Sequence, residues 1–136
     1  MKRISFWTFI IIVFPSCFKS NEIYFDIGDQ SIKSCNSQGL YKLDIQNDSL
    51  NEFYSIIWKD STKDSPKILK ITNIDAGYKI FKGWERNPIP NSNFHLKKYS
   101  SYAIEKSQGD ATPFKVKLFT DENGYVIRSD PNKCAE

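Results

Sequence analysis

The chain has 136 residues, with 19 Lys and Arg against 16 Asp and Glu, and 15% of its residues are aromatic. This length fits one domain, and so many aromatic residues are untypical of a disordered chain. The net charge is only +3, whereas nucleic-acid-binding proteins usually carry a strongly basic face. The composition therefore gives no indication of nucleic-acid binding.

The first segment in chain order has the character of a leader. Two basic residues precede an apolar run at 4–14, which is too short for a membrane-spanning helix of roughly twenty residues. A positive start, a short apolar run and a small residue before a cut site are typical of a secretory signal peptide. Ser16 and Cys17 also match the end of a bacterial lipobox, in which the cysteine receives diacylglycerol, although Phe14 stands where leucine is usual.

We therefore expect residues 1–16 to be a lipoprotein signal peptide, residues 17–22 to be the lipidated cysteine and a short tether, and residues 23–136 to form the folded domain. The alternative is an ordinary signal peptide followed by a chance cysteine. Lipidation predicts a bacterial cell-envelope protein that is membrane-anchored and faces the periplasm. Because Phe18 is not the aspartate that retains lipoproteins at the inner membrane, the outer membrane is favoured. Loss of the leader removes two of the 19 basic residues and leaves 17 against 16 acidic ones.

The other two cysteines are Cys35, near the start of the expected domain, and Cys134, near its end. The periplasm is oxidising, so the pair can persist as a disulfide that joins the last strand or the tail to the first part of the sheet. A zinc site is the alternative, but two isolated cysteines and one histidine lack the paired spacing of zinc ligands. We expect no metal and no cofactor.

Short β-strands are expected over the rest of the chain. Period-two alternation of apolar and polar residues, the mark of a half-buried strand, occurs at 23–27, 41–46 and 114–119. Asn-Gly after the last of these indicates a hairpin into 125–128, and further β-rich stretches lie at 53–59, 67–72 and 78–84. No convincing helix follows the leader. The pattern predicts an all-β fold, a single small β-sandwich of immunoglobulin-like type, with a small barrel as the alternative.

Catalytic groups are scarce in this sequence. His95 is the only histidine, so any histidine-assisted nucleophile must use it. Alternation in its segment places Phe94 and Leu96 on one face and leaves His95 on the other, in solvent. The acidic residues are scattered over turns, where Asp commonly bonds to the local backbone. We therefore predict no catalytic residues and a protein that is not an enzyme.

The segment 82–94 combines turn-forming residues with apolar side chains. Tryptophan and arginine dominate the energetics of protein interfaces, and prolines reduce the entropy lost when a loop is held in place. The candidate binding residues are Trp84, Glu85, Arg86, Pro88 and Ile89. The alternative is that Trp84 plugs the end of the sandwich and Ile89 covers its rim.

Residues 83–127 resemble the C-terminal half of small periplasmic lipoproteins that serve as immunity proteins of type VI secretion. That family pairs a lipoprotein leader with a small β-domain that has a tryptophan and prolines mid-chain, then a Tyr-x-Ile strand and a terminal hairpin. The matching residues are Trp84, Pro88, Pro90, Tyr102, Ile104 and Gly124. The resemblance implies a protein partner, namely a toxic effector that the protein neutralises.

Three classes of function remain open at this point. The first is a membrane-anchored, non-enzymatic binding protein that acts as an immunity protein against a secreted effector. The second is a structural or accessory envelope lipoprotein. The third is a carbohydrate-binding module in which Trp84 and nearby tyrosines stack on sugars. No nucleic-acid partner is expected.

Overall fold

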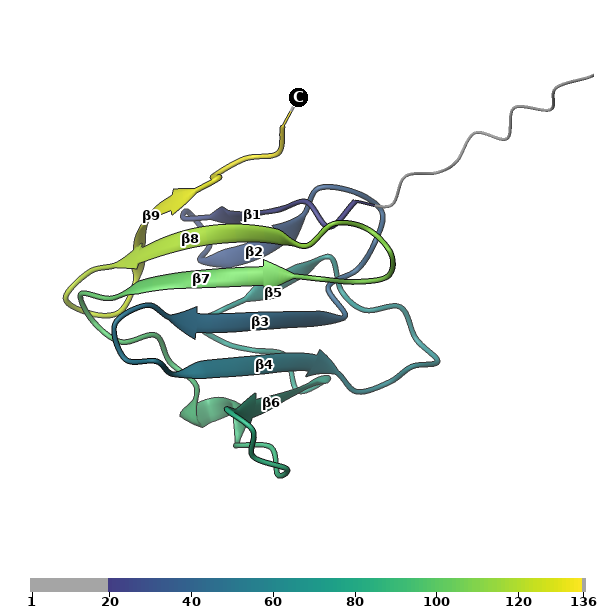
Figure 1. The fold of residues 1–136 in the computed structure, drawn as a ribbon, viewed down its shortest axis with the longest axis horizontal. Helices are drawn as coiled ribbons and strands as arrows, with labels where there is room; N and C mark the ends of the chain where they lie inside the picture. Colours follow the sequence, from purple (N-terminus) through teal and green to yellow (C-terminus); the bar gives the residue numbers. More distant parts are fainter. Residues whose placement is uncertain (1–19, 136) are drawn as a thin grey trace, which may run out of the picture.

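The computed structural model describes residues 20–135, which form two antiparallel β-sheets packed against each other (Figure 1). The smaller sheet has the order β1-β2-β5 and the larger one β6-β4-β3-β7-β8-β9. The strands are β1 (Ile23–Asp26), β2 (Ser31–Ser34), β3 (Lys42–Asn47), β4 (Phe53–Trp58), β5 (Ile68–Lys70), β6 (Tyr78–Lys82), β7 (Ser101–Lys106), β8 (Phe114–Thr120) and β9 (Val126–Asp130), with a short 3-10 turn η1 (Asn91–Asn93). The predicted all-β sandwich is confirmed. Its division into three and six strands is more unequal than the four and three of a constant-type immunoglobulin domain.

The signal peptide and the lipidation site predicted at Cys17 lie outside the described residues. Within residues 20–135, no helix is long and apolar enough to cross a membrane.

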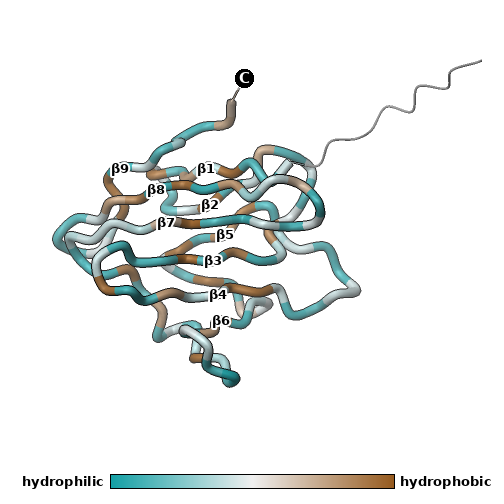
Figure 2. The backbone as a smooth tube through the Cα atoms, in the orientation of Figure 1, coloured by the Kyte–Doolittle hydropathy of each residue, from teal (hydrophilic) through white to brown (hydrophobic). Residues whose placement is uncertain are grey.

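The core lies between the two sheets. Alternate residues of each strand point inward, so hydrophobic residues follow the strands while the connections are mostly hydrophilic (Figure 2). Ile45, Ile56 and Ile104 of the larger sheet and Phe25 of the smaller one are fully buried. Close packing of these side chains is the main favourable contribution to folding.

Most strands fall where the sequence pattern predicts them. β7 was expected only from the family resemblance, as its Tyr-x-Ile strand, and β2 and β6 differ for clear reasons. β2 carries a single buried aliphatic residue, Ile32, between polar ones, which is too little for a period-two signal. It is a strand because it lies between β1 and β5 and pairs with both. β6 ends at Lys82 rather than at Trp84 because Gly83 has φ +59, a left-handed conformation that breaks the extended chain.

The sandwich has two distinct ends, which matter for the functional site. We name one the turn end: it carries the β1–β2, β3–β4 and β8–β9 turns and the chain before β7, at the left of Figure 1, and the chain after β6, at its lower centre. Hydrogen bonds join these segments, for example from the Gly83 backbone N to the Phe53 O at 2.8 Å and from the Asp48 N to the Ser101 O at 2.9 Å. We name the other end the tether end, because Ser20, the first described residue, lies there with the β7–β8 loop.

The predicted disulfide is present at the tether end. Cys35 and Cys134 are bonded, with a Cα–Cα distance of 5.6 Å and a sequence separation of 99. Cys35 directly follows β2 and Cys134 lies in the tail after β9, so the bond links the two sheets. Glu22 forms hydrogen bonds to the chain on both sides of the disulfide. Its backbone O accepts from the Cys35 N at 3.0 Å, and its Oε1 accepts from the Ala135 N at 2.6 Å. The expectation that the tail is joined to the first part of the sheet is confirmed.

One charged side chain lies inside the sandwich. Lys106 is fully buried, and the hydrogen-bond partner that residues 20–135 offer its Nζ is the Gln38 Oε1 at 3.4 Å. Burial disfavours the charged form and lowers the pKa of the Lys106 amine below its usual value. The position is core-facing because it continues the inward series of Tyr102 and Ile104 along β7.

Candidate protein-binding surface

Trp84 is the most exposed large hydrophobic side chain of the described residues. It is 92% exposed, because the left-handed Gly83 turns the chain out of β6 immediately before it. The alternative in which Trp84 plugs the sandwich is therefore wrong. Its ring contacts Phe53 edge to face, with centroids 5.2 Å apart and an interplanar angle of 74°.

A shallow hollow of about 510 Å³ lies between the β3–β4 turn and the chain after β6. Its polar part is organised around Glu52, whose carboxylate pairs with the Lys97 Nζ at 3.1 Å and the Lys82 Nζ at 3.9 Å. The hydrogen bond to Glu52 raises the pKa of Lys97, so the Lys97 amine stays charged near neutral pH. The hollow is lined by Asn51, Glu52, Phe53, Lys82, Gly83, Trp84 and Glu85.

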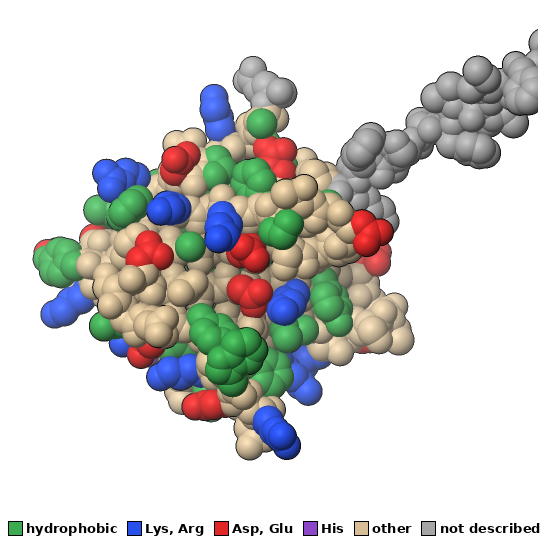
Figure 3. All heavy atoms as spheres, viewed as in Figure 1, with side chains coloured by type: hydrophobic (Ala, Val, Ile, Leu, Met, Phe, Trp, Pro, Cys, Tyr) green, Lys and Arg blue, Asp and Glu red, His purple; other side chains and the backbone are tan. Residues whose placement is uncertain are grey.

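The apolar surface continues from Trp84 onto the outer face of the larger sheet. β4 alternates about its buried Ile56, so Phe53 and Ile57 point outward and are half-buried. Phe81 of β6 stands opposite Ser55 on the same outer face. In Figure 3, which views this face, hydrophobic side chains gather over β4 and β6 and charged ones surround them. Together with Trp84, these residues form what we name the aromatic patch, which consists of Phe53, Ile57, Phe81 and Trp84.

The predicted binding residues do not all belong to this surface. Glu85, Arg86 and Pro88 are exposed beside Trp84. Ile89 lies apart from the exposed residues and is less accessible than they are. It is half-buried against the core, and its backbone N donates to the Ile80 O at 2.8 Å, because the chain folds back there along the edge of β6.

Phe53, Phe81 and the Glu52–Lys97 pair are the surface residues that sequence reasoning missed. A signal was present for Phe53, since residues 53–59 are apolar on both faces. The sequence predicts a strand here, and β4 lies inside its sheet, between β6 and β3. However, apolar residues on the outer face of a two-sheet sandwich also indicate an exposed apolar surface.

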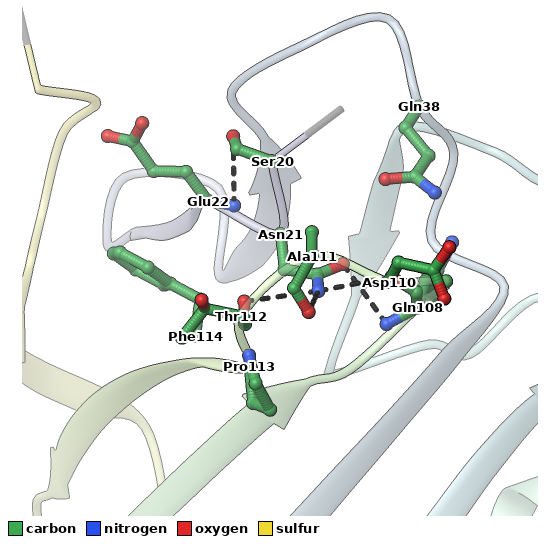
Figure 4. Close-up of a pocket in the computed structure, with 11 residues that line it drawn as sticks. Ser20, Asn21, Glu22, Gln38, Gln108, Asp110, Ala111, Thr112, Pro113 and Phe114 are labelled. Atoms are coloured by element: carbon green, nitrogen blue, oxygen red, sulfur yellow. Dashed lines mark hydrogen bonds between the residues drawn. The ribbon is translucent and has the colours of Figure 1, made fainter. Parts of the chain in front are cut away.

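A second hollow, of about 780 Å³, lies at the tether end (Figure 4). It is organised by Asn21, which is 1% exposed. The Asn21 Nδ2 donates to the backbone oxygens of Gln108, Ala111 and Thr112, each at 3.2 Å, and its Oδ1 accepts from the Gln108 N at 3.1 Å. These bonds satisfy the Asn21 amide and fix the β7–β8 loop onto the start of β1, so the hollow has a structural explanation.

Residues 20–135 contain no cluster of three or more His, Cys, Asp or Glu that could hold a metal ion. His95 is exposed while its neighbours Phe94 and Leu96 are 6% and 8% exposed, as the alternation predicts, although this segment is not a strand. No protein-family model, curated protein or solved structure matches the chain. Its function must therefore be argued from its own surface.

Proposed function

We propose that this protein is a membrane-anchored periplasmic lipoprotein that binds another protein without catalysing a reaction. Its partner is a toxic effector that it neutralises, as the resemblance in residues 83–127 implies. The single observation that carries the proposal is the 92% exposure of Trp84 beside a half-buried aromatic neighbour. An exposed tryptophan is costly to leave in water and is the residue type that most often anchors a protein interface.

The geometry of the rings favours a protein partner over a carbohydrate. Phe53 meets Trp84 edge to face at 74°, so the two rings offer no common plane on which successive sugar rings could stack. Lys97, Lys82 and Glu52 border the patch with charges of both signs. An apolar centre with a mixed polar rim is the usual anatomy of a protein–protein interface.

The proposal is tested by a protection assay in the bacterium that produces the protein. Deletion of the gene should make cells sensitive to effectors delivered by sibling cells, and a plasmid copy should restore protection. A copy carrying Trp84→Ala should fail to restore it, although its expression and thermal stability are expected to match those of the original protein. The matched control is Tyr41→Ala, which removes an exposed aromatic residue (43% exposed) at the tether end.

Two outcomes contradict parts of the proposal. Normal resistance of the deletion strain to every sibling effector would refute the immunity function and favour an accessory envelope lipoprotein. Full protection by the Trp84→Ala copy would show that the contact surface lies elsewhere.

A further inference from the structure

Exposed hydrophobic side chains are concentrated at the turn end of the sandwich. Eight large hydrophobic residues are classed as exposed among residues 20–135, and two of them, Tyr41 and Ile68, lie towards the tether end. The other six are at the turn end, on five separate segments: Ile27 (37% exposed), Leu50 (50%), Trp84 (92%), Tyr99 (73%), Tyr125 (52%) and Ile127 (61%). Scattered exposed apolar residues are normal, but a concentration of this kind marks an interaction site.

These turns hold their apolar residues in fixed positions. Tyr99 has φ +49, an unfavourable backbone conformation for a bulky residue, and its N donates to the Asp121 O at 3.0 Å. The Asn47 Oδ1 accepts from the backbone N of Leu50 at 3.2 Å. Turns whose backbone is already held by hydrogen bonds lose less entropy when a partner binds.

The turn end carries charged residues of both signs, some of which pair within the protein. Lys33 pairs with Asp26 at 2.7 Å and with Asp29 at 3.0 Å, and Lys97 pairs with Glu52 at 3.1 Å. Glu85, Arg86, Lys98 and Glu122 at the same end are exposed, two of each sign. Because the two signs offset each other, a partner gains little from a net opposite charge and binds mainly through apolar contacts. The complementary surface is one that is apolar and close to electrically neutral.

The position of the turn end also bears on the kind of partner. The chain enters the fold at Ser20 and Asn21 beside the β7–β8 loop, at the opposite end of the sandwich (Figure 1). A bilayer that holds the protein by its tether end leaves the turn end facing away from that bilayer. Aromatic residues at this end are thus presented to the periplasm rather than to the lipid.

We infer that four of the five segments at the turn end form one recognition surface, and that its partner is a folded protein with an apolar, near-neutral contact face. Leu50, Tyr99 and Tyr125 contribute to it together with Trp84, as the turns at one end of other β-sandwiches form a single binding site. This inference rests on the proposed function and extends it from one segment to four turns. The partner covers all four turns at once.

Site-specific photo-crosslinking in the producing bacterium tests this surface. A photo-reactive aromatic residue is placed singly at Leu50, Trp84, Tyr99 and Tyr125, and, as controls whose exposure is close to that of Leu50 and Tyr125, at Tyr41 and Ile68. The four turn-end positions should yield adducts with one and the same protein, identified by mass spectrometry, and the two control positions should not. Leu50→Ala and Tyr99→Ala should each weaken binding of that purified protein by about fivefold or more.

The possible failures are distinguishable. Adducts from Trp84 alone, with unchanged affinity for Leu50→Ala and Tyr99→Ala, would overturn the composite surface and leave the proposed function standing. An adduct with the mass of two copies of this chain would identify a homodimer interface, and crosslinks to lipid would identify a membrane contact; either overturns the inference. An absence of adducts at all four positions in cells that are still protected would overturn both the inference and the role of Trp84.

Discussion

Replacement of Cys35 and Cys134 by serine removes the covalent link between β2 and the chain after β9. The sequence separation of 99 closes a large loop, and the chain-entropy model gives about 4.7 kcal/mol of stabilisation for a loop of about 100 residues. Both cysteines are only half-buried, so serine hydroxyls at these positions remain partly hydrated and add little cost of their own. We therefore expect the free energy of unfolding to fall by about 3–5 kcal/mol.

Urea titration followed by tryptophan fluorescence measures this loss. With a urea slope of about 2 kcal/mol/M, typical of a small domain, the midpoint should fall by about 2 M. The original protein treated with a reducing agent provides the control and should unfold like the double variant. A loss below about 1 kcal/mol, with the bond verified by non-reducing peptide mapping, would refute the loop-entropy reasoning.

Three further changes probe the anchor, the core and a turn. Cys17→Ala should abolish membrane partitioning and the added lipid mass, whereas a soluble mature protein with an unmodified Cys17 would contradict the lipoprotein assignment. Because burial lowers the pKa of Lys106, the folded state loses this proton before the unfolded state does, so stability should rise with pH towards 10.5. Lys106→Met should remove that rise and stabilise the protein at neutral pH by about 1–3 kcal/mol; an equal rise in the variant would refute the assignment. Gly124→Ala should cost more than Gly109→Ala in a thermal melt, because both have positive φ but only at Gly124 would the Cβ come within 2.4 Å of the Leu96 O; equal costs would contradict this.

The parts of the fold that follow from alternation were predictable. Strands such as β3 and β8 expose one face and bury the other, so hydrophobicity along the chain reports their structure directly. The disulfide was predictable because the expected lipidation of Cys17 leaves two cysteines, which in the expected oxidising compartment allow one pairing. β2 was not predictable, since it has one buried aliphatic residue, Ile32, and is a strand only because it pairs with β1 and β5.

Only part of the candidate site could be predicted from the sequence. The segment around Trp84 could be singled out from residue types, but the exposure of Trp84 depends on the turn at Gly83. The partial burial of Ile89 depends on its pairing with Ile80 of β6. The gathering of Leu50, Tyr99 and Tyr125 at one end depends on strand order in three dimensions. No local pattern in the sequence carries that information.

The affinity of the Trp84→Ala protein for its partner tests the central claim most directly. With the partner identified by crosslinking and then purified, titration calorimetry can compare the original protein, Trp84→Ala and Tyr41→Ala. Truncation of an interface anchor costs about 2 kcal/mol or more, so we predict that Trp84→Ala binds about thirtyfold more weakly or worse, while Tyr41→Ala binds normally and all three proteins melt at the same temperature. Equal affinity of Trp84→Ala and the original protein would contradict the claim that the exposed tryptophan anchors the partner.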